Sequence, residues 1–334
     1  MSRTAAAAFM LLSMLWPLSV LGQEEDGWDF VPGEELLLFD DYSDMAKGAA
    51  PPHWKVRGAA VRLVDGRLTV GAGSATRMTP NVAKWPENFT IEMNVQGGPS
   101  AEDSLRNVTW VFERGDSWIW QVTLALYAGG TCRVTVEIAD PGENQNVDCS
   151  WMREGQNDLA LWVQDGRLRV YLNGNRLIDM NQLKLTFETA SLQVSADAIP
   201  VSLGAFRMAQ SAPDVSKTIL SSGRYVTHGV QFDVNSATLK PESTPVLRQI
   251  AEALAAAPTL KVRIEGHTDS TGDPAKNLDL SKRRAESVKM ALVDQFKIAA
   301  DRLTTDGFGD TKPAATNDTP KGRAENRRVE FAKI

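Results

Sequence analysis

Apolar and polar residues alternate with a period of two from Glu34 to about Met208, which is the pattern of half-buried strands. Residues 62–70, RLVDGRLTV, predict a hairpin around Asp-Gly. Residues 159–174, LALWVQDGRLRVYLNG, predict a second hairpin that ends in Asn-Gly. No stretch of this region sustains a helical period. We therefore expect an all-β sandwich of two sheets over residues 23–208.

The pattern changes in the last third of the chain. Residues 209–218 are polar and aperiodic, and we expect a linker over residues 209–224. Residues 225–334 then combine segments with the strand period of two and segments with the helical period, in the order βαβαββ. This order predicts a two-layer α/β domain with its helices on one face of the sheet. The expected strands are 226–233, 261–266, 302–307 and 327–333, and the expected helices are 241–257 and 277–296.

Length and composition fit two globular domains. The chain has 334 residues, of which 43% are hydrophobic and 23% are charged. Its net charge of -6 provides no excess of positive charge that would attract a polyanion, so we expect no nucleic-acid partner.

The first 22 residues predict a signal peptide. Arg3 precedes an apolar run from Ala5 to Leu15, and small residues lead to a cleavage site after Gly22. The alternative, an uncleaved membrane anchor, needs about 20 apolar residues. No cysteine lies in or just after this segment, so the sequence predicts no lipid attachment.

Cys132 and Cys149 are the only two cysteines. An even count in an exported chain predicts one disulfide between adjacent strands, worth about 3 kcal/mol by the chain-entropy argument. A metal pair or a nucleophilic thiol would need histidine partners, and His53, His228 and His267 are all distant in sequence. The sequence therefore predicts no metal, no cofactor and no catalytic residues.

Candidate chemistry gathers in residues 264–292. Gly266 ends a predicted strand, and the loop that follows carries Asp269. We expect an amphipathic helix that begins between Asn277 and Ser281, so Arg284 should lie within its first two turns. Arg284 also lies four residues before the apolar Val288, so its side chain should run beside the apolar stripe and reach the loop of Asp269. The two charges can then converge on one cleft. The alternative is that they only form a surface ion pair with each other, worth about 0–1 kcal/mol.

The spacing of these residues resembles the OmpA-like C-terminal domain of the OmpA/MotB family. The family's pattern is a Thr-Asp, a loop glycine, then N-x-x-L-S-x-x-R-A-x-x-V-x-x-x-L. The matching positions are Thr268, Asp269, Gly272, Asn277, Leu280, Ser281, Arg284, Ala285, Val288 and Leu292. Further matches extend the resemblance to residues 225–334.

The resemblance implies non-covalent binding of peptidoglycan through the diaminopimelate of its stem peptide. Asp269 would bind the ligand's ammonium and Arg284 a carboxylate. Thr271, Asn277, Arg327 and the loop at Asn235 would complete the pocket. It also implies a periplasmic, peptidoglycan-associated protein, possibly at the outer membrane, in a Gram-negative cell.

The N-terminal half resembles a concanavalin-like or laminin-G-like jelly roll through its hairpins and its opening Phe39-Asp40-Asp41-Tyr42-Ser43. Trp118 and Trp120 could form a glycan-stacking platform on one side of a strand, or could fill the core as large aromatics do. Residues 137–143, EIADPGE, come close to the E-x-D-x-x-E of laminarinase-like jelly rolls, but their spacing is shifted and Pro-Gly breaks the strand.

These observations favour a non-enzymatic tether that links a sandwich domain, and through it another envelope component, to the cell wall. The alternative is a carbohydrate-binding or carbohydrate-active jelly roll that the second domain docks on the wall. A stator-type subunit is a third reading, but such proteins carry an uncleaved helix and lack the sandwich.

Overall fold

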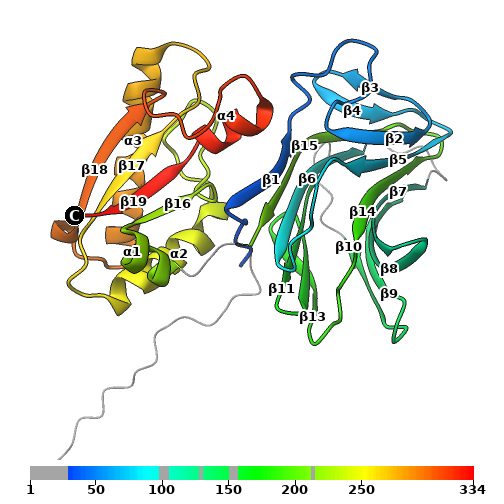
Figure 1. Cartoon of the computed structure of the whole chain (residues 1–334), viewed down its shortest axis with the longest axis horizontal. Coiled ribbons are helices and arrows are strands. Elements are labelled where there is room, and N and C mark those ends of the chain that lie inside the picture. Colours follow the sequence, from blue (N-terminus) through cyan, green and yellow to red (C-terminus); the bar gives the residue numbers. More distant parts are fainter. Residues whose placement is uncertain (1–28, 98–104, 128–130, 150–156, 212–214) are drawn as a thin grey trace, which may run out of the picture.

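The computed structural model describes residues 29–97, 105–127, 131–149, 157–211 and 215–334. The predicted signal peptide, residues 1–22, lies outside the described residues. Among the helices of the described part, none combines the length and hydrophobicity needed to cross a membrane. Two bodies make up the described chain, an all-β sandwich and a smaller α/β domain that faces it across strand β1 (Figure 1).

The sandwich consists of two antiparallel sheets. Sheet A has the order β13-β12-β11-β6-β15-β4-β3, and β1 also pairs with β15. Sheet B has the order β10-β9-β8-β7-β14-β5-β2. The strands of sheet A are β1 (Glu35–Asp40), β3 (Val61–Val64), β4 (Arg67–Val70), β6 (Phe89–Gly97), β11 (Asn157–Gln164), β12 (Arg167–Leu172), β13 (Asn175–Met180) and β15 (Val201–Gln210). Those of sheet B are β2 (Trp54–Gly58), β5 (Ser74–Pro80), β7 (Arg106–Arg114), β8 (Ser117–Leu126), β9 (Cys132–Ile138), β10 (Asn144–Cys149) and β14 (Thr189–Ala196).

Both predicted hairpins are confirmed. Strands β3 and β4 pair across Asp65-Gly66, and β11 and β12 pair across Asp165-Gly166. Both turn residues have positive φ in each hairpin, as a type I′ turn requires. The predicted all-β sandwich is therefore the observed fold of this half.

The core between the sheets is strongly aromatic. Trp110, Phe112 and Trp120 are fully buried, and the rings of Phe112 and Trp120 stack with their centroids 3.5 Å apart. Trp118 is 44% exposed, so the expectation that Trp118 and Trp120 point to the same side is wrong. The cause is a β-bulge, since Phe112 pairs with Trp120 while its neighbour Glu113 pairs with Trp118.

The second domain is a four-stranded mixed sheet, sheet C, in the order β16-β19-β17-β18. Strands β17 and β18 are parallel and the other pairs are antiparallel. Its elements are α1 (Val215–Ser222), β16 (Arg224–Thr227), a 3-10 turn (Pro241–Ser243), α2 (Thr244–Ala256), β17 (Val262–His267), α3 (Pro274–Asp294), a second 3-10 turn (Ala300–Arg302), β18 (Leu303–Gly309), α4 (Pro320–Asn326) and β19 (Val329–Lys333). Apolar residues of α1, α2 and α3 form one buried cluster with the sheet.

Several predicted boundaries differ from the structure. The expected linker, 209–224, contains the end of β15 and the whole of α1, whose Val215 and Ile219 are buried in the second domain's core. The first strand of that domain ends at Thr227 rather than at 233. Helix α4 has no counterpart in the prediction, because it is too short to show a helical period.

Cys132 and Cys149 lie directly opposite each other on β9 and β10, and both are buried. The structure has them as free thiols rather than as the expected disulfide. A hydrogen bond to Cys149, together with burial, raises the pKa of Cys132, and the same bond lowers the pKa of Cys149. The two thiols therefore interact directly with each other. The disulfide between them remains a prediction.

The two domains contact each other through the start of the sandwich. Val31 belongs to the apolar cluster of the second domain, and α4 packs beside β1 (Figure 1). Glu34 accepts hydrogen bonds from the hydroxyls of Tyr225 and Thr227 and from the backbone N–H of His228, at 3.1, 2.7 and 2.8 Å. A carboxylate held by three donors fixes this junction.

Candidate binding site

Two glycines allow helix α3 to lie close against sheet C. A Cβ on Gly266 would lie 2.2 Å from the carbonyl oxygen of Ser281, and a Cβ on Gly307 would lie 2.3 Å from the backbone nitrogen of Lys282. Only glycine permits this approach. The contact places the middle of α3 beside the end of β17, where the loop of Asp269 begins.

Asp269 is held by groups on both sides. Its Oδ1 accepts from the backbone N–H of Thr271 at 2.9 Å, and its Oδ2 accepts from Nη1 of Arg327 at 2.6 Å. Burial raises the pKa of this carboxyl, but the hydrogen bonds of Arg327 and Thr271 outweigh burial and hold the pKa below its usual value. Asp269 is therefore ionised at neutral pH, and its carboxylate retains acceptor capacity beyond these two bonds.

Arg284 lies beside Asp269 but does not pair with it. Helix α3 begins at Pro274, where the side chain of Asp273 caps it by accepting from the backbone N–H of Lys276. Arg284 therefore lies in the middle of the helix, and the expectation that it lies within the first two turns is wrong. Burial lowers the pKa of Arg284, whereas the charge of Asp269 raises it, so the two charges interact without contact.

The Arg284 guanidinium is oriented by uncharged groups. Its Nε donates to the backbone oxygen of Ser236 at 2.9 Å, and its central carbon lies 4.8 Å from the centroid of Phe232. Among the described residues, no carboxylate lies within ion-pair distance of it. The alternative of a simple Asp269–Arg284 ion pair is therefore not what the structure has, since Arg327 is the partner of Asp269.

The other predicted residues take different places. Asn277 donates from Nδ2 to the backbone oxygens of Asp269 and Thr271, at 3.3 and 3.0 Å, and so shapes the loop. Asn235 is exposed, with φ of 53°, and directly precedes Ser236, the residue that holds Arg284. Asn235 is thus near the site, with its side chain open to solvent.

A pocket of ≈ 240 Å³ lies next to these residues. Arg284 and Arg327 line it together with Phe232, His267 and Arg328. Sequence reasoning did not single out the last three. Phe232 and Arg328 fall within residues 225–334, over which the sequence resembles the family, but their position in the pocket depends on contacts between distant segments. The pocket is cationic, so it suits an anionic group of a ligand.

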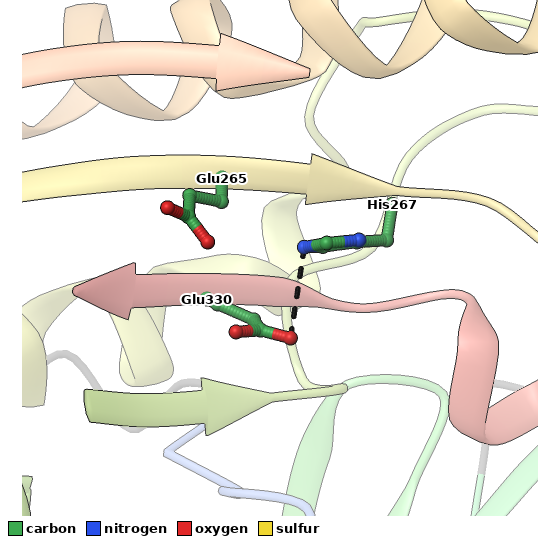
Figure 2. A group of neighbouring side chains, drawn as sticks. All are labelled: Glu265, His267 and Glu330. Carbon is green, nitrogen blue, oxygen red and sulfur yellow. Dashed lines mark ion pairs between the residues drawn. The ribbon is translucent and has the colours of Figure 1, made fainter. Parts of the chain in front are cut away.

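Glu265 and His267 of β17 and Glu330 of β19 form a buried group, which Figure 2 shows, and His267 also lines the cationic pocket. Nε2 of His267 lies 3.6 Å from Oε1 of Glu330, and neither ring nitrogen has a hydrogen-bond partner in the described part of the chain. Burial and the nearby Arg328 lower the pKa of His267 to about 4, so the ring is neutral. Such a set of ligand atoms raises the question of a metal ion.

The surrounding arginines argue against a metal at this place. Glu265 pairs with Arg224 at 2.8 Å and with Arg263 at 2.6 Å. Glu330 pairs with Arg224 and, at 2.6 Å, with Arg328. Three guanidinium groups thus face two carboxylates, and a divalent cation would have to displace them against their charge. The arrangement fits a buried network of arginine and glutamate better than a metal centre.

The described chain thus presents an α/β domain with a charged cleft, joined to a β-sandwich. The OmpA family profile matches residues 231–327, and this region is an OmpA family domain. Outer membrane protein Omp38 of Acinetobacter baumannii is 48% identical over 105 residues, which are 31% of this chain and 29% of that protein. Peptidoglycan-binding protein ArfA of Mycobacterium tuberculosis is 42% identical over 107 residues, 32% of each chain. The matched region is therefore about a third of these relatives.

Solved structures resemble each half of the chain. The cell wall anchor of the T6SS from Pseudomonas aeruginosa is 30% identical with a TM-score of 0.30, and covers 36% of this chain and 93% of its own. SCLam, a non-specific endo-beta-1,3(4)-glucanase from family GH16, is 12% identical with a TM-score of 0.43, and covers 53% of this chain and 94% of its own.

The acidic residues of 137–143 do not form a row on one strand. Glu137 is on β9, and Glu143 follows a turn that contains the Asp140-Pro141 bond and Gly142. Glu137 accepts from Nε2 of Gln121 on the neighbouring strand. Glu137 and Glu143 both line an open pocket of ≈ 560 Å³ with Asp116 and Trp118, but Asp140 does not line it, so the three carboxylates of this motif do not converge there.

Proposed function

We propose that the OmpA family domain binds peptidoglycan without covalent attachment, and that it holds the sandwich on the cell wall. The observation that carries this proposal is the pair Asp269 and Arg284. The two opposite charges lie near enough to influence each other, and yet each is left with capacity for a ligand. This arrangement suits a zwitterionic group better than a single ion.

The ligand that fits best is the diaminopimelate of the stem peptide. Its free amino-acid end carries an ammonium and a carboxylate on one carbon. Asp269 would accept from the ammonium, and Arg284 would donate to the carboxylate in a two-pronged geometry. Charge-assisted hydrogen bonds of this kind contribute about 1.5–3 kcal/mol each.

The role of Arg327 follows from its bond to Asp269. In the described state it neutralises Asp269 while lining the cationic pocket. We infer that Arg327 keeps Asp269 ionised and oriented, and that it adds positive charge beside the ligand's carboxylate. Thr271 and Asn277 support this geometry by shaping the loop, and Asn235 lies at the open side.

A periplasmic location, associated with peptidoglycan and near the outer membrane, follows from the same proposal. It is supported by the names of two relatives, an outer membrane protein and a peptidoglycan-binding protein. We propose a non-enzymatic tether with peptidoglycan as its partner.

Peptide titrations test the proposal. The whole protein is titrated by calorimetry with a stem tetrapeptide that contains diaminopimelate, and with the same peptide containing lysine. Lysine lacks the second carboxylate, so we expect binding weaker by about 10- to 100-fold. Equal affinity for the two peptides would contradict the assignment of Arg284 to that carboxylate.

A further inference from the structure

A second pocket, of ≈ 280 Å³, lies at the junction of the two domains. One wall is the outer face of sheet A, the face turned toward the OmpA family domain (Figure 1). The other wall is the segment between β16 and α2. The lining includes Phe39, Glu92, Asn94, Asp158 and Arg207 from the sandwich, and Gln231, Lys240 and Glu242 from the second domain.

This junction pocket is adjacent to the candidate site of Asp269 and Arg284. Gln231 lines both the junction pocket and the cationic pocket of Arg284. Arg327, the partner of Asp269, lies with its guanidinium carbon 5.5 Å from the ring centroid of Phe39. A ligand held at Asp269 and Arg284 can therefore extend onto the sandwich without leaving the protein surface.

On the sandwich wall of the junction pocket, polar side chains pair with each other. Asn94 donates from Nδ2 to Oδ1 of Asp158 at 2.8 Å, and Nη1 of Arg207 donates to Oε1 of Glu92 at 2.6 Å. On the opposite wall, Oε2 of Glu242 is buried and has no hydrogen-bond partner among the described residues. A buried carboxylate oxygen without a donor is costly, so a donor from a ligand would stabilise it.

The charges of the pocket select against an anionic ligand. Its lining holds the carboxylates Glu92, Asp158 and Glu242 and the cations Lys240 and Arg207. A stem peptide's carboxylates would meet this surplus of negative charge. A neutral ring with several hydroxyl groups would instead find donors and acceptors, and the partly exposed ring of Phe39 could contact its apolar face.

We propose that the junction pocket is a second subsite, which binds one sugar ring of the glycan strand whose stem peptide occupies the Asp269 and Arg284 site. The inference rests on the proposed function. The volume is near the lower end for ligand pockets, as a single ring requires. The sandwich is then part of the surface that binds the cell wall, and the two domains bind the same peptidoglycan strand.

The test compares two ligands on the whole protein. One is the stem tetrapeptide with diaminopimelate, and the other is the same peptide attached to its disaccharide. We expect the disaccharide ligand to bind about tenfold more tightly. Asp158→Ala and Glu242→Gln, which change opposite walls, should each remove most of this difference and leave tetrapeptide binding unchanged.

Asp148→Ala is the matched control, because Asp148 is an exposed carboxylate on β10 of sheet B that pairs with Arg133 and lies outside the pocket. It should change neither affinity. Equal binding of the two ligands by the parent protein, or an unchanged difference in both variants, would overturn the subsite. If the parent binds neither ligand, the proposed function itself fails, which is a separate result.

Discussion

Replacing Gly266 by alanine should disturb the site by displacing helix α3, and it leaves the side chains of Asp269, Arg284 and Arg327 unchanged, although Gly266 itself lines the pocket. The added Cβ would lie 2.2 Å from the carbonyl oxygen of Ser281, and ordinary contact begins at 3.4 Å. Helix α3 must therefore move by about 1 Å. Overpacking of this kind costs roughly 1–3 kcal/mol of unfolding free energy.

The displacement also reaches Arg284, which follows Ser281 by less than one turn of α3. Its 2.9 Å bond to the backbone oxygen of Ser236 cannot survive a shift of that size without rearrangement. Since a binding group must be held within about 0.5 Å of its productive position, we expect tetrapeptide affinity to fall at least tenfold.

Urea unfolding and calorimetric titration of the Gly266→Ala variant measure both effects. Gly71→Ala is the control, because a Cβ there meets nothing nearer than the Ser74 hydroxyl at 4.0 Å. A Gly266→Ala protein with parental stability and parental affinity would refute the view that glycine contacts position α3 and Arg284.

Three further outcomes are expected. Cys132 and Cys149 should be oxidised in exported protein, so two alkylatable thiols under non-reducing mass spectrometry would contradict the disulfide. His267 is neutral in the fold, with a pKa of about 4 against 6.5, so the unfolded chain binds the extra proton between these values. The free energy of unfolding should therefore be highest above pH 6.5 and fall by up to about 3 kcal/mol toward pH 4. Urea unfolding should show a weaker pH dependence in the His267→Gln variant. Enzymatic digestion of the wall should release the protein from cell envelopes, and its persistence in wall-free outer membranes would indicate another anchor.

Local signals predicted the elements that local chemistry controls. Asp65-Gly66 and Asp165-Gly166 determine their turns through positive φ, so the hairpins were predictable from a few residues. The alternation of apolar residues predicted the buried faces of the strands. Neither signal could reveal the bulge near Trp118, because a bulge depends on how two strands pair.

The candidate site was predictable in its residues but not in its pairing. Asp269 and Arg284 stand out by motif, and both lie at the cleft. Arg327 is 58 residues from Asp269, and nothing local predicts that it is the ion-pair partner. The junction pocket also could not be predicted from the sequence, because it forms where segments near residues 39, 94, 158 and 242 meet.

Pull-down on purified sacculi tests the central claim most directly. The full-length protein is compared with Asp269→Ala and Arg284→Ala, each of which leaves the opposite ligand charge unpaired at a cost of about 2–5 kcal/mol. The controls are Asp279→Ala and Arg283→Ala, which break an exposed pair on the same helix, with 67% and 53% of the side chains accessible. We predict that both site variants stay folded and lose sacculus binding, while both controls bind like the parent. Site variants that remain bound as well as the parent would contradict peptidoglycan recognition by this cleft.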